Sequence, residues 1–502
     1  KLAEKNRKWW ILLAMSSSLA LVFIDQTALA VALPAIQREL NLSNSLSQWV
    51  INAYLLALSA IILLGGKIGD RLGHKRAFLA GVIVFITAST LAALAESGAW
   101  LITARAIQGI GAAFMMPSTN ALVTNAFPAQ ERGKALGIYI ALATIFLALG
   151  PLLGGFLTQV FSWRAVFWIN FPIALISIIL AISSVPTWRR REKLNIDYLG
   201  FFISVIFISG FVLGFMEAPN WGWTSLPIMG LFLLSIISLI TFIGWEKKIP
   251  HPLVELTLFK NLTFTTLFSV LLIIQAVAIV FVFLAIFLQN VLHYSPLMAG
   301  LLLLPAMVPI MLMAPVGGHL RDKYGPTLPM FCGALLVVLS LIWIAIFSHN
   351  RGYAWLFPGL LVYGIGMPLI LSGIMATVMN MVNAQQRGMA SAIFNCARQF
   401  GNTIGLALLT GLLASVNKWQ LNSFLHHSPV PLSRLKEQQI DGLLVQSDQA
   451  MKAIAHLSLA HIELLKTAAL NAYTNAFSMT LLAAAILAFL SLFLILKIPR
   501  KQ

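Results

Sequence analysis

GKIGDRLG at residues 66–73 and GHLRDKYG at residues 318–325 follow one pattern, G-x-x-x-D-[RK]-x-G, and begin 252 residues apart. A second motif repeats at nearly the same distance, because QERG at residues 130–133 is matched 255 residues later by QQRG at residues 385–388. Two different motifs at nearly one offset indicate an internal duplication. The sequence therefore predicts two similar halves that run in the same direction.

The composition excludes a water-soluble protein. Of 502 residues, 59% are hydrophobic and 10% charged, and the mean hydropathy is +0.88. A soluble domain carries about 25% charged residues. The net charge of +17 would suggest nucleic-acid binding in a soluble chain, but in a membrane protein it is better explained by orientation. We expect an all-α integral membrane protein with no nucleic-acid partner.

Apolar runs of about 20 residues are long enough to cross the hydrocarbon core of a bilayer. The sequence contains fourteen such runs, and the first is too long for a signal-peptide core of about 7 to 15 residues. The predicted transmembrane helices lie at residues 9–34, 47–65, 76–95, 99–124, 133–157, 164–185, 198–216, 225–245, 263–290, 297–320, 327–347, 353–381, 388–415 and 472–497.

The basic residues predict the orientation of these spans. If the N-terminus is cytoplasmic, 23 of the 33 Lys and Arg residues lie in inner segments, 8 lie in outer segments and 2 lie within spans. An excess of Lys and Arg marks the cytoplasmic loops of membrane proteins. We therefore expect both termini in the cytoplasm and a multi-pass protein of a bacterial inner membrane.

The duplication and the spans together predict the domain organisation. Residues 1–190 form an N-terminal six-helix bundle, residues 191–260 contribute two inserted linker helices, and residues 261–502 form a C-terminal six-helix bundle. An extracytoplasmic helical insertion is expected at residues 417–471. Parallel repeats of this kind are typical of transporters that move two halves around a site near the membrane midplane.

Three further motifs make a family resemblance specific. Span 1 contains Asp25-x-Thr27, span 4 contains Arg105-x-x-Gln108-Gly109, and span 5 ends with Gly150-Pro151-x-x-Gly154-Gly155. With the repeated loop motif, the chain resembles the major facilitator superfamily, specifically its fourteen-span drug:proton antiporter subfamily. The resemblance implies the major facilitator fold, with two six-helix bundles plus two inserted helices.

The same resemblance implies a function. It indicates a proton-coupled secondary active exporter, an antiporter of lipophilic small molecules such as drugs, that works by alternating access. The alternative is a dedicated exporter or flippase of a lipid, a siderophore or another secreted metabolite. The expected partners are a small amphiphilic substrate, protons and the lipid bilayer. The expected state of the protein is a monomer.

Asp25 and Arg105 are predicted to form the proton-coupling pair. A charged side chain deep in a span costs about 2.5 to 3.5 kcal/mol on insertion scales and is a functional candidate by default. At 1.5 Å per residue, Asp25 lies about 24 Å from the inner end of its span, and Arg105 lies about 8 Å from the outer end of its own. Both charges are therefore in the outer half. The alternative is a static ion pair that only orients two helices.

Two groups of residues are predicted to gate the transporter. The repeated motif places glycines, which permit unusual turns, beside fixed charges in tight inner loops, and the resemblance implies that Asp70 holds the halves together on the cytoplasmic side. The alternative is a charge cluster that only sets topology. In span 5, small residues allow neighbouring helices to approach closely. This packing either blocks a leak through the transporter or is purely structural. The predicted gating residues are Gly66, Asp70, Arg71, Gly73, Asp322, Lys323, Gly150, Pro151, Gly154 and Gly155.

Polar residues inside spans are candidates for the substrate cavity. Arg398 either binds an anionic part of a substrate or satisfies backbone carbonyl groups. Because Asp25 is the only acidic residue well inside a span, monovalent cations, neutral amphiphiles or zwitterions fit better as substrates than divalent cations. Arg105 and Arg398 leave an anionic substrate as a further possibility. The predicted cavity residues are Asp25, Gln108, Gln275, Asn395, Arg398 and Gln399.

Other classes of protein lack sequence support. The sequence contains no G-x-S-x-G or H-E-x-x-H motif, which an intramembrane enzyme could use. It also contains no P-loop, which an ATP-driven pump would need. Cys332 and Cys396 both lie in apolar stretches and are expected to be small core residues. We therefore expect no catalytic residues, no metal site and no cofactor, with the proton gradient as the energy source.

Overall fold

The computed structural model describes residues 6–128, 131–186, 197–250, 252–382, 387–427 and 459–498. All regular secondary structure in these segments is helical. The helices are α1 (Arg7–Glu39), α2 (Asn44–Leu72), α3 (His74–Ala93), α4 (Gly98–Ala126), α5 (Arg132–Val160), α6 (Ala165–Trp168), α7 (Asn170–Ser184), α8 (Tyr198–Trp221), α9 (Leu226–Glu246), η2 (Leu256–Lys260), α10 (Leu262–Ala278), α11 (Val280–Asn290), α12 (Pro296–Tyr324), α13 (Thr327–Phe347), η3 (Ser348–Asn350), α14 (Tyr353–Met381), α15 (Arg387–His427) and α18 (Leu459–Ile495).

Each of the fourteen predicted spans corresponds to one helix or one broken pair of helices. Two spans are broken, between α6 and α7 at Ile169 and between α10 and α11 at Ile279. Thirteen of the described helical segments are long and apolar enough to cross a membrane, and α5 contributes a shorter apolar stretch at Ile145–Val160. The chain is thus a multi-pass membrane protein.

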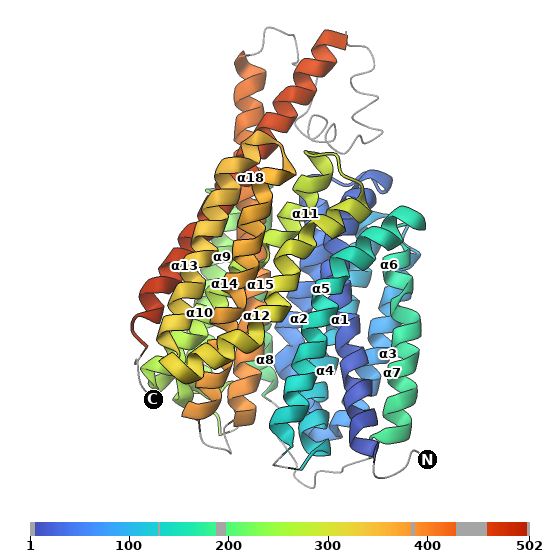
Figure 1. Ribbon diagram of the computed structural model, residues 1–502, viewed down its shortest axis with the longest axis vertical. Helices are drawn as coiled ribbons and strands as arrows, with labels where there is room; N and C mark the ends of the chain where they lie inside the picture. The colour runs from blue at the N-terminus through green and yellow to red at the C-terminus, as the bar shows by residue number, and fades with distance from the viewer. Residues whose placement is uncertain are drawn as a thin grey trace.

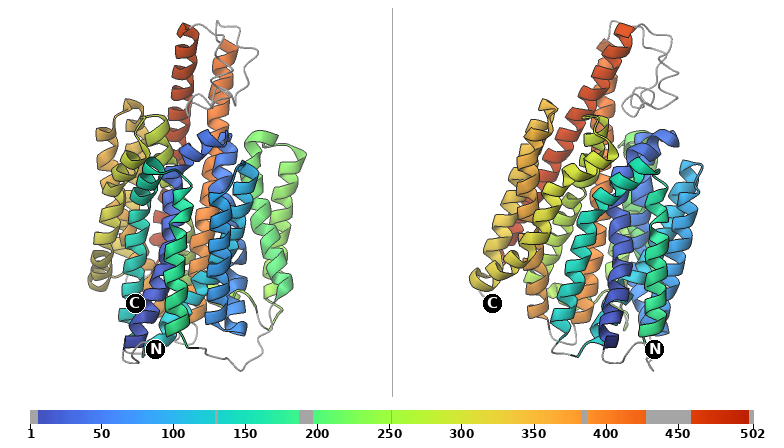
Figure 2. Two further views of the ribbon diagram at one scale, coloured as in Figure 1. Left: turned by 90° about the vertical axis from the view of Figure 1, so that its right-hand side faces the viewer. Right: turned by 45° about the vertical axis from the view of Figure 1, so that its right-hand side comes forward.

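Successive spans run in opposite directions between two faces of the bundle. We call the face at Arg7 and Ile495 the terminal face, and the face at Glu39 and Pro296 the far face. Figure 1 shows α1 to α7 on one side and α10 to α18 on the other. Figure 2 shows α8 and α9 as a separate pair at the edge of the bundle.

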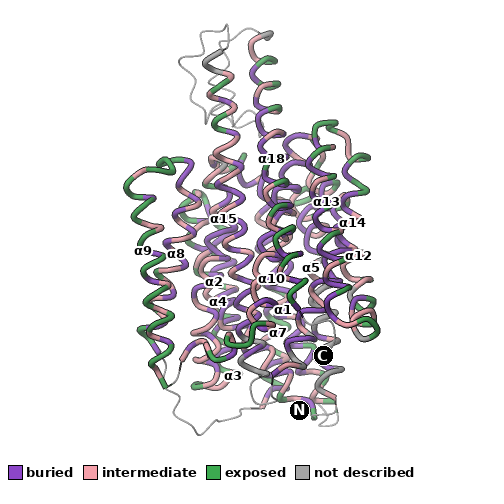
Figure 3. The backbone as a smooth tube through the Cα atoms, turned by 90° about the vertical axis from the view of Figure 1, so that its left-hand side faces the viewer, coloured by how far each residue is buried: buried purple, intermediate pink, exposed green. Residues whose placement is uncertain are grey.

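Burial distinguishes the inner helices from the peripheral ones. In α1, 83% of the most apolar 18-residue window is buried, against 17% in α9. Figure 3 shows this contrast, with exposed residues along most of α9. The outward side chains of α9 are large and apolar, including Leu226 and Ile240, as a surface in contact with lipid tails requires.

The helices that extend furthest beyond their predicted spans are α15 and α18. α15 and α18 continue beyond the other helices at the far face (Figures 1 and 2). Residues 417–427 of the expected insertion extend α15, and residues 459–471 extend α18. The rest of the insertion and the predicted domain boundary at 190–191 lie outside the described residues.

The prediction that the repeated motif forms an inner loop was wrong for most of its length. Residues 66–72 are the last two turns of α2, and residues 318–324 end α12. The reversals take place at Gly73, with φ of 95°, and Gly325, with φ of 81°. Such φ values strain residues with a Cβ atom. Gly73 alone separates α2 from α3, and Gly325 and Pro326 separate α12 from α13, so one or two residues replace the expected loop.

Several contacts near the far face join the two halves. The α12 backbone N–H of Leu297 donates to Gln159 Oε1 of α5 at 3.2 Å, and Gln289 Nε2 of α11 donates to the Val31 carbonyl of α1 at 2.8 Å. α5 and α12 lie side by side there and diverge toward the terminal face (Figures 1 and 2). This arrangement joins the halves at the far face.

Candidate functional site

Asp25 and Arg105 meet in the interior of the N-terminal half. Arg105 Nη1 donates to Asp25 Oδ2 at 2.5 Å. Both side chains are 0% exposed. The depths derived from helix rise placed the two residues at one level, and the structure brings them into contact.

Two amide side chains complete the surroundings of the Asp25 carboxylate. Gln108 Nε2 donates to Asp25 Oδ1 at 3.0 Å, and its Oε1 accepts from Arg105 Nη1 at 2.6 Å. Asn170 Nδ2 approaches Asp25 Oδ1 at 3.3 Å and donates to Ser89 Oγ at 3.0 Å. We call Asp25, Arg105, Gln108, Asn170 and Ser89 the Asp25 network.

The network joins four helices because small residues let them approach. Arg105 and Gln108 are one turn apart on α4 and therefore share a face. A methyl group at Gly109 would overlap the Tyr54 carbonyl of α2, and one at Gly111 would overlap the Phe85 backbone of α3. The glycines of the span-4 motif thus set the depth at which α4 carries Arg105 into the bundle.

Aromatic rings and one backbone carbonyl hold the guanidinium of Arg105. Its Nε donates to the Val50 carbonyl at 3.0 Å. Its Cζ lies 4.4 Å from the centre of the Tyr54 ring and 5.8 Å from that of Phe167. Such cation–π contacts stabilise a desolvated cation by about 2 kcal/mol or more.

Two buried polar atoms of the network have no hydrogen-bond partner among the described residues. They are Arg105 Nη2 and Asn170 Oδ1. Buried polar groups are nearly always paired, and the exceptions often belong to functional sites. Within the described residues, one donor and one acceptor of the network are therefore without a protein partner.

The cavity candidates of the C-terminal half lie on α10 and α15, and one of them, Arg398, contacts α1. Arg398 Cζ of α15 lies 5.2 Å from the centre of the Phe23 ring, two residues before Asp25. Gln399 Nε2 contacts Met116 Sδ of α4 at 3.7 Å. Gln275 of α10 is buried where Gly401 of α15 packs against it. Asn395 is half-buried on α15.

The predicted gating residues of the repeated motif lie at the terminal face. His74 Nε2 of α3 lies 3.2 Å from Asp70 Oδ1, and Arg71 is exposed. Lys323 Nζ lies 5.1 Å from the ring centre of its neighbour Tyr324. The side chain of Asp322 lies outside the described residues. The gating role of this motif stays a prediction.

The glycines of span 5 contact two neighbouring helices. A Cβ atom at Gly150 would overlap Thr27 of α1, and one at Gly154 would overlap Ala28. Gly155 instead faces the Pro296 carbonyl of α12, in the other half. The same motif thus packs α5 within its own half and across the boundary between halves.

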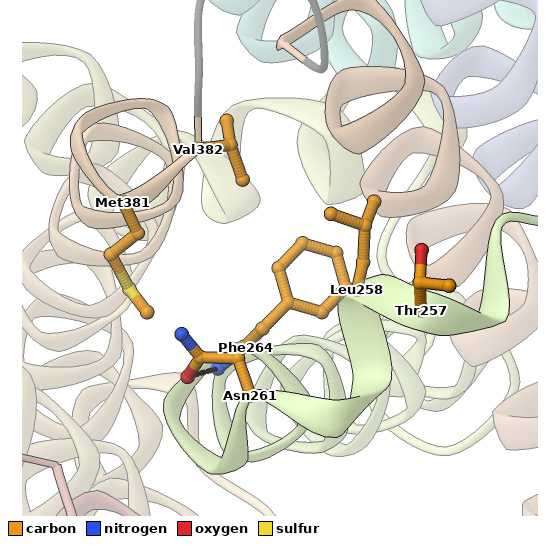
Figure 4. Close-up of a pocket in the computed structure, with 6 residues that line it drawn as sticks. All are labelled: Thr257, Leu258, Asn261, Phe264, Met381 and Val382. Carbon is orange, nitrogen blue, oxygen red and sulfur yellow. Dashed lines mark hydrogen bonds between the residues drawn. The ribbon is translucent and has the colours of Figure 1, made fainter.

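A cavity of about 210 Å³ lies away from these residues. Figure 4 shows its lining, formed by η2, α10 and the end of α14, with Asn261 Oδ1 accepting from the Phe264 backbone N–H at 3.4 Å. It contains none of the predicted site residues. We therefore place the candidate site at the Asp25 network and the facing part of α15.

The family model described as "Major Facilitator Superfamily" matches residues 15–406. The chain belongs to the major facilitator superfamily. It is 32% identical to the multidrug resistance protein Stp of Mycobacterium tuberculosis, over 84% of this chain and 79% of that one. It is 31% identical to the tetracenomycin C resistance and export protein of Streptomyces glaucescens, over 82% of this chain and 77% of that one.

The fold agrees with this membership. A solved bacterial homologue of the human lysosomal transporter Spinster aligns with a TM-score of 0.65 and 18% identity, over 98% of both chains. At that identity the likeness concerns the fold alone. This major facilitator protein therefore has the transporter fold of its superfamily, which is not an enzyme family.

Sequence reasoning missed three residues of the site. Asn170 and Ser89 belong to the Asp25 network, and Phe23 lies under Arg398. Asn170 is a lone amide within an otherwise apolar stretch of span 6, and polar groups inside spans are functional candidates. That signal was available for Asn170. Ser89 and Phe23 are common residue types in a membrane helix and carry no such signal.

Proposed function

We propose that this protein is a proton-coupled exporter of lipophilic small molecules that works by alternating access. The observation that carries the proposal is the fully buried Asp25 carboxylate, held by Arg105 and two amides within the N-terminal half. The relatives named for multidrug resistance and for tetracenomycin C export support an export direction.

The proton acts on the pairing of Asp25. An ionised Asp25 neutralises Arg105, and a protonated Asp25 leaves the guanidinium without a counter-charge. Breaking a buried ion pair by removing one charge costs about 3 to 5 kcal/mol if nothing rearranges. That cost is large enough to change which arrangement of the halves is preferred. Proton entry and substrate exit are thereby linked through one carboxylate.

The open polar atoms of the network favour coupling over a static ion pair. A purely structural pair gains from having every donor and acceptor satisfied. Arg105 Nη2 and Asn170 Oδ1 instead have no hydrogen-bond partner among the described residues. They offer the carboxylate and its neighbours alternative hydrogen bonds when the charge of Asp25 changes.

The orientation follows from the basic residues. We propose that the terminal face is cytoplasmic, because it carries residues of the basic clusters, including Arg71, Lys247 and Lys323. A proton driven inward across the membrane potential supplies about 2.3 kcal/mol per 100 mV. The far-face contacts of α5 with α12 then form the extracytoplasmic barrier. We propose further that the protein acts as a monomer in a bacterial inner membrane and needs no cofactor other than the proton gradient.

Accumulation of a fluorescent lipophilic cation and of a fluorescent lipophilic anion in pump-deficient cells tests the function. We expect the wild type to lower accumulation of at least one dye, and an uncoupler or the Asp25→Asn substitution to abolish the effect. Asp197→Asn is the matched control, because Asp197 is a buried carboxylate outside the network that caps α8. It should leave efflux unchanged.

Two results would count against the proposal. Uncoupler-sensitive efflux by a folded Asp25→Asn variant would make the ion pair structural. Absence of efflux of both dyes by folded wild-type protein would favour a dedicated exporter or flippase of a lipid or metabolite.

A further inference from the structure

Three polar residues form a line along α15 in the middle of the membrane span. Asn395, Arg398 and Asn402 follow an i, i+3, i+7 spacing and therefore share one face of the helix. All three are half-buried. We call them the α15 polar stripe. Most other described residues in this stretch of α15 are buried.

Arg398, the central residue of the stripe, lies against the N-terminal half. Arg398 Cζ lies 5.2 Å from the centre of the Phe23 ring on α1. Nearby, Thr403 Oγ1 of α15 and Ser59 Oγ of α2 are 2.6 Å apart. The half-exposed atoms of the stripe therefore adjoin the boundary between the halves, where alternating access requires the substrate to pass.

The guanidinium of Arg398 has no salt bridge or hydrogen bond within the described part of the chain. The alternative role of Arg398, hydrogen bonding to backbone carbonyl groups, is thus not observed within those residues. Asn395 and Asn402 likewise have no hydrogen bond within those ranges. A guanidinium carries five N–H donors in its plane, and no hydrogen bond of these donors is found within the described residues.

The buried arginine of the N-terminal half has a carboxylate partner, whereas the arginine of the stripe has none among the described residues. Arg105 is neutralised by Asp25, whereas no described carboxylate forms a salt bridge with Arg398. An uncompensated cation inside a membrane span is costly and marks a substrate or ion pathway by default. An arginine fork binds carboxylates, phosphates and similar oxyanions in a bidentate manner.

We propose that the α15 polar stripe binds the anionic group of an amphiphilic substrate, with Phe23 contacting its apolar part. This inference rests on the proposed export function and names a substrate class for it. Exit of an anion and entry of a proton are both favoured by a membrane potential that is negative inside. The Asp25 network would then handle the proton, and Arg398 the substrate.

Two probes with the same apolar body test the site. Anilinonaphthalene sulfonate and N-phenylnaphthylamine differ by the sulfonate group, and the fluorescence of both rises in apolar surroundings. Their binding to purified protein in lipid nanodiscs is measured without a proton gradient. We expect Arg398→Gln to weaken sulfonate binding about tenfold or more, the effect of losing a charged hydrogen bond. Binding of the neutral probe should stay within about twofold by the same reasoning.

Two further variants keep the test decisive if Arg398→Gln does not fold. Asn402→Asp is nearly isosteric and places a carboxylate one turn from Arg398, so it should also weaken sulfonate binding about tenfold. Arg398→Lys keeps the charge and should retain most of the affinity. Arg351→Gln, at an exposed arginine on the far face, controls for general attraction of anions and should change nothing.

The outcomes separate this inference from the proposed function. Equal sulfonate affinity in the wild type and in both Arg398→Gln and Asn402→Asp would overturn the assignment of the stripe, whatever the transport assays show. Parallel loss of both probes in Asn402→Asp would also overturn it, because a charge-specific site predicts loss of the sulfonate alone. Failure of Asp25→Asn to abolish transport would instead contradict proton coupling and leave the binding result standing.

Discussion

The carboxylate of Asp25 contacts three side chains, two from α4 and one from α7. Arg105 supplies the opposite charge, and Gln108 connects the two groups on the α4 side. Asn170 approaches from α7 and links Asp25 to Ser89 of α3, which in turn donates to the Phe167 carbonyl beside the break in span 6. The charge of Asp25 is thereby connected to the one point where span 6 is discontinuous.

Asn170→Ala tests this connection at the scale of a single residue. The substitution removes a donor to the carboxylate, and a hydrogen bond to a charged group contributes about 1.5 to 3 kcal/mol. We expect transport to fall about tenfold or more, measured as the initial rate of uncoupler-sensitive efflux at matched protein levels.

The control for this prediction lies on the same helix. Ser177 is also buried and donates to the Ala14 carbonyl at 3.0 Å, away from Asp25. Ser177→Ala removes a neutral hydrogen bond that contributes about 0.5 to 1.5 kcal/mol, so it should lower the melting temperature slightly and leave the transport rate unchanged. Equal rates for the two variants would mean that Asn170 only packs the helices.

At the scale of helices, close approach depends on glycine. α5 carries Gly150 and Gly154 against α1, and Gly155 against α12. Pro151 removes one backbone donor in the same turn, and Gly300 of α12 faces the Pro151 carbonyl. The motif therefore joins α5 to both halves near the far face.

Gly154→Ala tests the packing of α5 on α1. The added methyl group would overlap the Ala28 backbone, and overpacking costs about 1 to 3 kcal/mol. We expect a lower melting temperature of the purified protein. Gly230→Ala is the matched control, because a Cβ atom at Gly230 of α9 meets nothing within 4 Å. That variant should be neutral or slightly stabilised, by up to about 1 kcal/mol. Equal melting temperatures would show that α5 can move away from α1 at no cost.

The whole molecule presents one face that carries both ends of the described chain. α1 begins and α18 ends at the terminal face, and the even number of spans requires it. α15 and α18 project from the opposite face. Together with the basic residues, this arrangement predicts a cytoplasmic terminal face.

Cysteine labelling in spheroplasts tests the orientation. In a background with Cys332→Ala, which removes the exposed free cysteine, Asn350→Cys on the far face should react with a membrane-impermeant maleimide. Lys248→Cys on the terminal face should react only after permeabilisation. Both positions are exposed, so the opposite labelling pattern would mean that the protein is inserted the other way round.

The sequence predicted features that depend on position along a helix. Apolar runs set the spans, the paired motifs indicated two halves, and the rise per residue placed Asp25 and Arg105 at one depth. These properties need no knowledge of neighbouring helices. The same reasoning erred at residues 66–72, because hydropathy falls before a helix ends and the polar last turns of α2 were read as a loop.

The tertiary structure decided which side chains meet, because that depends on the rotation of each helix about its own axis. Phe23 and Asp25 are two residues apart, yet one faces Arg398 and the other faces Arg105. Asn170 reaches Asp25 only because α7 packs on α1 and α3 beside the break at Ile169. Glycines on α4 and α5 set these rotations and separations through contacts with other helices. A single sequence gives the depth of each group in the membrane, and packing gives its partner.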